Sequence, residues 1–206
     1  MTISMEQLHL VVMELQDRAD IRDCVHRYAR GADRLDRELM LSAYHADAID
    51  EHGKFVGTAG DFVDWAMKQH TDAHLSHQHY ILNHTCELDG DMAHAETYFM
   101  FVSMNRQGKP LTMNGGRYVD RFEKREGVWA IAYRACLRDW AMMDARPDMD
   151  DLSSFTSTRS LLSAQMRTFM NNGLGAKRDR SDPSYHRPLH ADLERVRAYT
   201  EMKRRA

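Results

Sequence analysis

Hydrophobic residues near the start of the chain recur at helical spacing. Over residues 15–32 the apolar side chains return every third or fourth position, and charged side chains occupy the other face. This pattern predicts an amphipathic helix that ends near Gly31. Similar spacing predicts a short second helix over residues 37–44 and a third over residues 60–70. We therefore expect the first third of the chain to be mainly helical.

Later in the chain the pattern changes to long segments rich in Tyr, Phe, Val and Ile, separated by short polar turns that contain Gly. These segments predict a four-stranded antiparallel meander, with strands over residues 77–88, 93–104, 111–124 and 128–142. Strands of this length favour a curved sheet. Helices followed by such a sheet predict an α+β fold, in which the sheet wraps around the helices and leaves an internal pocket.

The composition changes again after the meander, first to Asp, Ser and Thr and then to an amphipathic stretch that ends at Asn171-Asn172-Gly173. A last helix is expected over residues 191–203. Because this region shows no core of its own, we predict one domain over residues 1–145 and a helical C-terminal extension over residues 146–206. The extension is expected to cover the pocket or to form a subunit contact.

Composition and charge narrow the function classes. The formal net charge is only -3 and no half of the chain carries a continuous basic stripe, which argues against nucleic-acid binding. Cys24, Cys86 and Cys136 form no CxxC pair, so neither a disulfide framework nor a thiolate zinc site is indicated. The apolar run at the N-terminus is too short for a signal peptide or a membrane span. We therefore expect a cytoplasmic protein that binds a small apolar substrate, with no membrane partner.

Five histidines lie close together in the sequence: His70, His74, His77, His79 and His84. Two of them are four positions apart on a predicted helix and two share a strand face, so a metal site is a possible interpretation. The chain has no HExxH motif, however, and Cys86 is expected on the opposite strand face from His77 and His79. We therefore predict a site without a metal, with His70 and His74 on the polar face of their helix.

Three segments carry the most recognisable pattern: IRDCVHRYARGADRLD, SHQHYILNHTCELDGDMAHAETYF and GGRYVDRFEKREGVWAIAYR. Together they resemble the SnoaL-like enzymes of the nuclear transport factor 2-like superfamily, over roughly residues 15–142. The resemblance implies a cone-shaped α+β barrel, with N-terminal helices packed in a curved antiparallel sheet. It also implies proton-transfer chemistry without a cofactor, as in scytalone dehydratase, bile acid 7-alpha-dehydratase and the diarylpropane lyases that release formaldehyde.

The resemblance also implies which residues are catalytic. The elimination enzymes of this family place an Asp just past the first long helix and a His on the first meander strand, which correspond here to Asp33 and His79. Tyr28 and Arg138 correspond to two further family positions. In this arrangement His79 would remove a substrate proton and Asp33 would stabilise the imidazolium. Tyr28 or Arg138 would assist the leaving group, and the identity of the proton donor stays open.

Other side chains are expected to bind the substrate. Where some dehydratases of the family carry a further Asp or His, this chain has Phe99 and Phe101 on the second meander strand. Fifteen methionines and several aromatic residues favour a roomy apolar cavity that suits an aromatic or polycyclic substrate. The residues predicted to contact the substrate are Trp65, Asn83, Phe99, Phe101, Asn114 and Arg134.

Each candidate also has a purely structural interpretation. His79 could be a core histidine bonded to the backbone, Asp33 part of the turn that ends its helix, and Tyr28 a core ring. Arg134 and Arg138 alternate on one strand face and are expected to point inward, together with Val128, Ala130 and Ala132. A buried Arg needs a partner, which could be Asp33 or an anionic group of the substrate. The alternative is that the arginines lie at an exposed strand end and pair with Asp139 or Asp120.

The leading prediction from the sequence is a cofactor-independent lyase that eliminates water or formaldehyde from a hydroxylated aromatic or polycyclic substrate, in aromatic compound catabolism. One alternative is an isomerase or cyclase of a steroid- or polyketide-like substrate, in which the abstracted proton is returned. The other is a non-catalytic scaffold subunit, similar to the small subunit of aromatic-ring dioxygenases, or a binding module. The resemblance also implies a homo-oligomer, with a trimer as the expected state.

Overall fold

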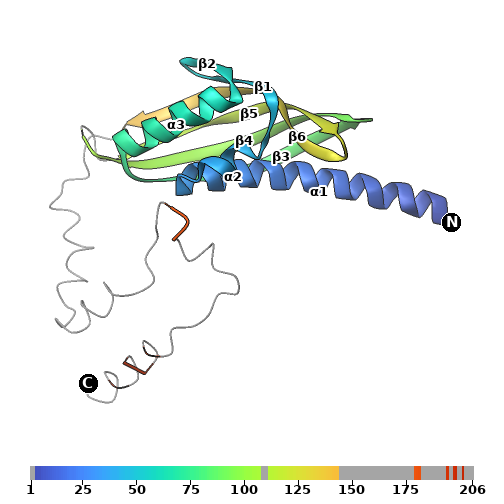
Figure 1. Cartoon of the computed structure of the whole chain (residues 1–206), viewed down its shortest axis with the longest axis horizontal. Coiled ribbons are helices and arrows are strands. Elements are labelled where there is room, and N and C mark those ends of the chain that lie inside the picture. Colours follow the sequence, from blue (N-terminus) through green and yellow to red (C-terminus); the bar gives the residue numbers. More distant parts are fainter. Residues whose placement is uncertain are drawn as a thin grey trace. The chain divides into compact units, whose positions relative to one another are not determined.

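The computed structural model describes residues 3–107, 111–143, 179–181, 194, 197–198 and 201. Within the described residues, two helices are followed by two strands, a third helix and four long strands (Figure 1). The helices are α1 (Met5–Arg34), α2 (Arg37–Leu41) and α3 (Ala59–Ala73), and the strands are β1 (Tyr44–His52), β2 (Phe55–Thr58), β3 (His74–Asp89), β4 (Met92–Asn105), β5 (Leu111–Arg125) and β6 (Val128–Met143). The predicted α+β class is confirmed.

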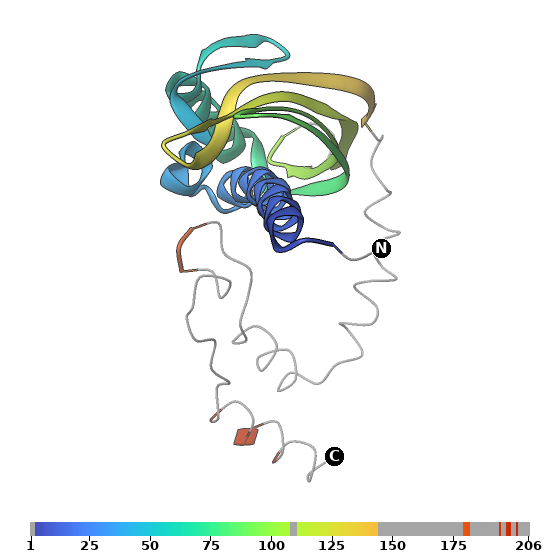
Figure 2. The same cartoon turned by 90° about the vertical axis from the view of Figure 1, so that its right-hand side faces the viewer.

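These strands form one curved, unclosed sheet in the order β2-β1-β6-β5-β4-β3. Neighbouring strands are antiparallel except for β1 and β6, which are parallel. Figure 2 shows the sheet as an arch, with α1 seen nearly end-on beneath its concave side. The predicted four-stranded antiparallel meander is confirmed as β3, β4, β5 and β6. The sequence prediction missed β1 and β2, which extend the sheet. Strand β1 was missed because its inner face carries Asp50 and His52, which break the apolar alternation of a half-buried strand.

Helix α1 begins well before the predicted start. Ser4 caps it, because the Ser4 hydroxyl accepts from the backbone N–H of Gln7 at 3.1 Å and the Gln7 side chain accepts from the backbone N–H of Ser4 at 3.0 Å. The second half of α1 supplies the buried face that was predicted, with residues Ile21, Cys24, Val25, Tyr28 and Ala32 in the core. The first half of α1 is exposed, so the spacing of hydrophobic residues predicted only the second half of the helix.

The end of α1 packs tightly against α2. A Cβ atom on Gly31 would overlap the backbone of Met40, so the close approach of the two helices depends on glycine at this position. Leu35 ends α1 in a left-handed conformation, with a φ of 52°.

Two bulges change which side chains face inward. In β3 the register shifts between Ile81 and His84, so two residues oppose one on β4 and the alternation reverses. His79 and Ile81 face inward before the bulge, and His84 and Cys86 do so after it. Two predictions are corrected here: Asn83 is exposed, and Cys86 lies on the same face as His79.

The second bulge lies in β6, where the register shifts between the pairs Phe122–Ile131 and Arg121–Tyr133. It leaves Ala132 as the extra residue, and the inward set changes from Trp129 and Ile131 to Arg134 beyond it. Val128, predicted to face inward with Arg134, is instead 61% exposed.

Most of the predicted C-terminal extension lies outside the described residues. The amphipathic stretch predicted to end at Asn171-Asn172-Gly173 lies wholly outside them. Of the helix predicted over residues 191–203, the described residues Glu194, Arg197, Ala198 and Glu201 are helical. The boundary near residue 145 stays a prediction. Among the described helices, none combines the length and the apolar character needed to cross a bilayer.

Candidate active site

A cavity of about 760 Å³ lies inside the domain, bounded by side chains from α1, α3 and the inner face of the sheet. This volume is within the range of small-molecule sites, and aromatic rings with a few polar groups make up most of the wall. The lining side chains that bear on its chemistry are Tyr28, His52, Phe62, Trp65, His70, His74, His79, Phe99, Phe101, Asn114, Tyr118, Cys136 and Arg138.

The structure brings Asp33 and His79 together at this wall. Nδ1 of His79 lies 2.7 Å from Oδ1 of Asp33, and the backbone N–H of His79 donates to both carboxylate oxygens at 3.0 Å. Because a carboxylate accepts hydrogen bonds, the neutral form of this imidazole carries its proton on Nδ1 and has a lone pair on Nε2. His79 lines the cavity and Asp33 supports it from behind. The pair is therefore arranged for proton transfer at Nε2.

Tyr28 lines the same cavity from the buried face of α1, with 2% of its surface exposed. Its ring lies edge-on to His79 with the centroids 6.3 Å apart, and its hydroxyl is hydrogen-bonded to that of Tyr118. Burial raises the pKa of Tyr28 well above its usual value, and the charge of Arg134 opposes this only in part. The phenol therefore stays protonated at neutral pH and can donate a hydrogen bond to an oxygen atom in the cavity.

Most of the other predicted site residues also reach the cavity. Strand pairing aligns His79, Phe101 and Asn114 across β3, β4 and β5. The predicted residues that line the wall are Trp65, Phe99, Phe101, Asn114 and Arg138. Asn83 does not line it, because the bulge in β3 turns this side chain to the exposed face.

Arg134 lies behind the cavity wall rather than in it. Its Nε and Nη2 donate to the two oxygens of Asp120, each at 2.7 Å, and both side chains are fully buried. The guanidinium is held between two rings, 4.2 Å from the centroid of Tyr28 and 4.1 Å from that of Tyr118. Asp120 is therefore the partner that a buried Arg requires, and Asp33 is not. Arg134 supports the two tyrosines that form part of the wall.

A second histidine–aspartate pair lines the cavity and was not foreseen. His52 and Asp50 lie two residues apart on the inner face of β1, with Nδ1 of His52 3.2 Å from Oδ1 of Asp50. Asp50 is fully buried, and its other oxygen accepts from the Tyr44 hydroxyl at 2.6 Å. The sequence signal for this pair is the spacing Asp-x-His. It places both side chains on one face only if the segment is a strand, and β1 was not predicted.

Charged side chains also lie close together beside this pair. Strand pairing places Asp50, Arg134 and Asp120 next to one another across β1, β6 and β5. Burial raises the pKa of Asp120, while the charges of Arg134 and His52 lower it and that of Asp50 raises it further. Two buried carboxylates and one guanidinium therefore lie next to one another at this edge of the site, and the guanidinium is hydrogen-bonded to Asp120.

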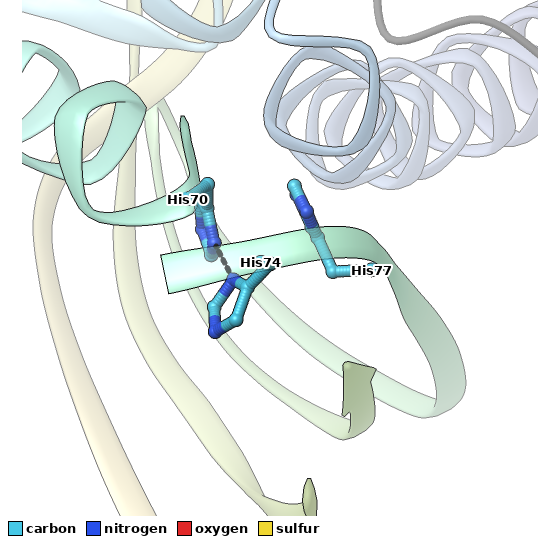
Figure 3. Close-up of side chains that lie close together, drawn as sticks. All are labelled: His70, His74 and His77. Carbon is cyan, nitrogen blue, oxygen red and sulfur yellow. Dashed lines mark hydrogen bonds between the residues drawn. The ribbon is translucent and has the colours of Figure 1, made fainter. Parts of the chain in front are cut away.

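Three further histidines, His70, His74 and His77, cluster where α3 meets β3 (Figure 3). The Nδ1 atoms of His70 and His74 are 3.2 Å apart, and Nε2 of His77 donates to the carbonyl oxygen of Ala32 at 3.0 Å. The prediction that His70 and His74 belong to a polar helix face is wrong, because both line the cavity.

Among the described residues, two groups of side chains lie close enough together to hold a metal ion: this cluster, and Asp33 with His77 and His79. In each group one ligand atom of every residue lies within 4.8 Å of the others. The His77 hydrogen bond to a carbonyl is typical of a metal-ligating imidazole. The rings of His70 and His77, however, stack almost in parallel with their centroids 4.1 Å apart. Imidazoles bind a metal through lone pairs in the ring plane, so stacked rings have to reorient before both can bind one ion.

Cys136 is the thiol in the cavity wall. Burial raises its pKa to about 12, with the charges of Arg134 and Arg138 opposing the rise. A nucleophilic thiolate is therefore scarce at neutral pH, and covalent catalysis through this residue is disfavoured.

Solved structures of other proteins share the fold of this chain. A candidate scytalone dehydratase from Novosphingobium aromaticivorans is 14% identical, with a TM-score of 0.60 over 66% of this chain and 93% of its own. The hexachlorocyclohexane dehydrochlorinase LinA-type3 from Novosphingobium barchaimii is 20% identical, with a TM-score of 0.58 over 64% of this chain and 92% of its own. Both share the nuclear transport factor 2-like cone fold with this chain.

A third similar structure is a candidate aromatic ring hydroxylase from Novosphingobium aromaticivorans, 19% identical, with a TM-score of 0.58 over 63% of this chain and 94% of its own. No curated protein matches the chain. The family model for the SnoaL-like domain matches residues 13–135, which is more than half of the chain and contains both histidine–aspartate pairs. The chain therefore belongs to the family of SnoaL-like domains.

Proposed function

We propose that this chain is a cofactor-independent lyase that removes water or formaldehyde from a hydroxylated aromatic or polycyclic substrate. The observation that carries the proposal is the Asp33–His79 hydrogen bond at the wall of an aromatic cavity. A carboxylate on Nδ1 fixes the tautomer of the imidazole and stabilises the imidazolium that forms when Nε2 accepts a proton.

In loss of water, Nε2 of His79 takes a proton from the substrate carbon. The released electron pair forms a double bond, and the C–O bond to the departing hydroxyl breaks. In loss of formaldehyde, His79 instead takes the proton of a hydroxymethyl group, and the bond from its carbon to the substrate breaks. The electron pair of that bond then forms a double bond as a neighbouring hydroxyl leaves. General base catalysis of this kind contributes a factor of about 10²–10⁴ in rate.

The rest of the cavity suits this chemistry. Phe99 and Phe101 offer ring faces to an aromatic substrate, and the protonated phenol of Tyr28 can stabilise a developing oxyanion. Arg138 lies near the exposed end of the wall, where its charge can orient an anionic substituent. Two of the similar structures support the reaction class, since a dehydratase and a dehydrochlorinase both carry out eliminations.

The test is product analysis with the purified full-length chain. A panel of hydroxylated aryl compounds is incubated with the protein, and products are identified by mass spectrometry. Loss of the mass of water, or of formaldehyde and water together, supports a lyase, whereas a rearranged product of unchanged mass indicates an isomerase or cyclase. No turnover, together with a tightly co-purifying large subunit, favours the scaffold alternative.

The variant His79→Ala tests whether the reaction takes place at the proposed site. It removes the base, so turnover should be abolished while circular dichroism shows a folded protein. His94→Gln changes an exposed histidine on β4 and is the matched control. Substantial activity in His79→Ala, at the level of the control, would overturn the proposed function.

A further inference from the structure

We propose that His52, held by Asp50, is the proton donor to the departing oxygen, so that the cavity contains an acid opposite the base. This inference rests on the proposed function, which leaves the proton donor unassigned. His52 and His79 reach one cavity from strands near opposite edges of the sheet, because the sheet curves around it. Each imidazole has a carboxylate on Nδ1, which leaves the other nitrogen for the substrate.

The surroundings of His52 differ from those of His79 in charge. Strand pairing places Asp50 next to Arg134, which in turn pairs with Asp120 on β5. Both Nε and Nη2 of Arg134 donate hydrogen bonds to Asp120. Asp50 is fully buried and has a neutral phenol, Tyr44, and His52 as its hydrogen-bonded partners. Buried charges require compensation, and the imidazolium form of His52 supplies the second positive charge for two carboxylates.

The position of His52 also suits proton donation to a bound substrate. Its ring stacks on Phe62 with the centroids 4.7 Å apart and lies 6.2 Å from the ring of Tyr118, both of which line the cavity. Stacking holds the plane of the ring, and the hydrogen bond to Asp50 holds its rotation. The imidazole is therefore oriented before the substrate binds.

The proton balance of the reaction closes with two histidines. His79 gains the proton taken from the substrate, and the electron pair that is released forms the new double bond. The C–O bond breaks as His52 transfers its proton to that oxygen, so the group leaves as water. After product release, His79 returns a proton to solvent and His52 takes one up, so neither an oxidant nor a cofactor is consumed.

The test compares two leaving groups. A hydroxyl needs a proton to depart, whereas chloride leaves as an anion. The probes are a β-hydroxy aryl ketone and the corresponding β-chloro aryl ketone, with the uncatalysed rates subtracted. We expect His52→Gln to lower kcat for the hydroxy ketone by about 10²–10⁴ and to leave turnover of the chloro ketone nearly unchanged. His52→Phe, which preserves the stack on Phe62, should behave in the same way.

His79→Ala separates the two proposals, because loss of the base should abolish turnover of both ketones. If His79→Ala is inactive and His52→Gln turns over both ketones as the wild type does, the acid role is overturned and the proposed function stands. If His79→Ala keeps its activity, the proposed function itself fails.

A measurement on the folded wild-type chain needs neither a variant of His52 nor a substrate. Nitrogen NMR of the His52 ring should show protons on both ring nitrogens at neutral pH, and Asp50→Asn should remove one of them. A singly protonated ring in the wild type would overturn the proposal.

Discussion

Nδ1 of His79 lies 2.7 Å from Oδ1 of Asp33, and the same carboxylate accepts the backbone N–H of His79. The end of α1 and the start of β3 are thus joined through one side chain. Asp33 has two effects, since it positions the strand and sets the tautomer of the imidazole.

Asp33→Asn separates these two effects. The amide keeps the size of the side chain and can still accept from the backbone N–H, but it carries no charge to stabilise an imidazolium. We expect kcat to fall by about 10²–10⁴ while the midpoint of thermal unfolding changes little. Steady-state kinetics and circular dichroism measure the two quantities. Asp72→Asn, on the exposed face of α3, is the control, and equal activity of the two variants would contradict the role of Asp33.

Tyr28→Phe removes a hydroxyl from the wall and keeps the ring. If the phenol donates to a developing oxyanion, kcat should fall by about 10²–10³, the effect of losing one such donor. Because burial raises the pKa of Tyr28, the wild type should keep this donor above pH 10, the usual value of a phenol. Activity that falls through pH 10 in the wild type and not in Tyr28→Phe would contradict this. Tyr98→Phe, on the exposed face of β4, is the control.

The class of fold was predictable because the meander strands are long apolar segments bounded by glycine turns. The start of α1 was also open to prediction, since Ser4 and Gln7 form the capping pattern Ser-x-x-Gln. Strand β1 was not, because Asp50 and His52 occupy inward positions where a strand pattern requires apolar residues. The polar residues that prevented prediction of β1 are the ones that line the cavity or hold its ionisable groups.

The bulges set a second limit on prediction. Strict alternation predicts an inward Asn83 and an outward Cys86, and one extra residue in β3 reverses both. The choice of His79 among five neighbouring histidines came from the family resemblance, because residue chemistry alone ranks them equally. The partner of Arg134 depends on pairing between β5 and β6, which places Asp120 opposite it.

Breaking the Arg134–Asp120 pair should destabilise the protein. Arg134→Met leaves the carboxylate of Asp120 buried without its partner, so we expect the free energy of unfolding to fall by about 3–5 kcal/mol. Urea denaturation measures the change. Arg117→Gln, which breaks ion pairs at the sheet surface, should change stability far less. A stable Arg134→Met variant with a raised KM would instead assign Arg134 to substrate binding, as the sequence suggested.

Metal removal tests the predicted absence of a metal. If His79 and its partners carry out the reaction alone, dialysis against a chelator should leave kcat and KM unchanged. The outcome could differ at Asp33 with His77 and His79, or at the histidine cluster of His70, His74 and His77. Loss of activity that Zn²⁺ restores in the wild type, but not in His74→Gln, would show a metal at this cluster.

His84 should make stability depend on pH. This residue lies beyond the bulge in β3, with Nδ1 2.8 Å from the hydroxyl of Thr97 and Nε2 buried without a hydrogen-bond partner among the described residues. Burial lowers the pKa of His84 below its ordinary value of 6.5, and the charges of Arg22 and His26 lower it further. As pH falls through 6.5, the unfolded chain therefore takes up the proton before the folded chain does.

The sign of the effect follows from this order of protonation. The stability that His84 contributes as a neutral imidazole is complete above pH 6.5 and is lost as pH falls from 6.5 toward the folded-state pKa. His84→Gln should therefore reduce the fall in the free energy of unfolding in this window, measured by urea denaturation at several pH values. His94→Gln, at an exposed position, should retain the wild-type slope. Equal slopes for the two variants would mean that His84 becomes protonated equally easily in the folded and unfolded chains.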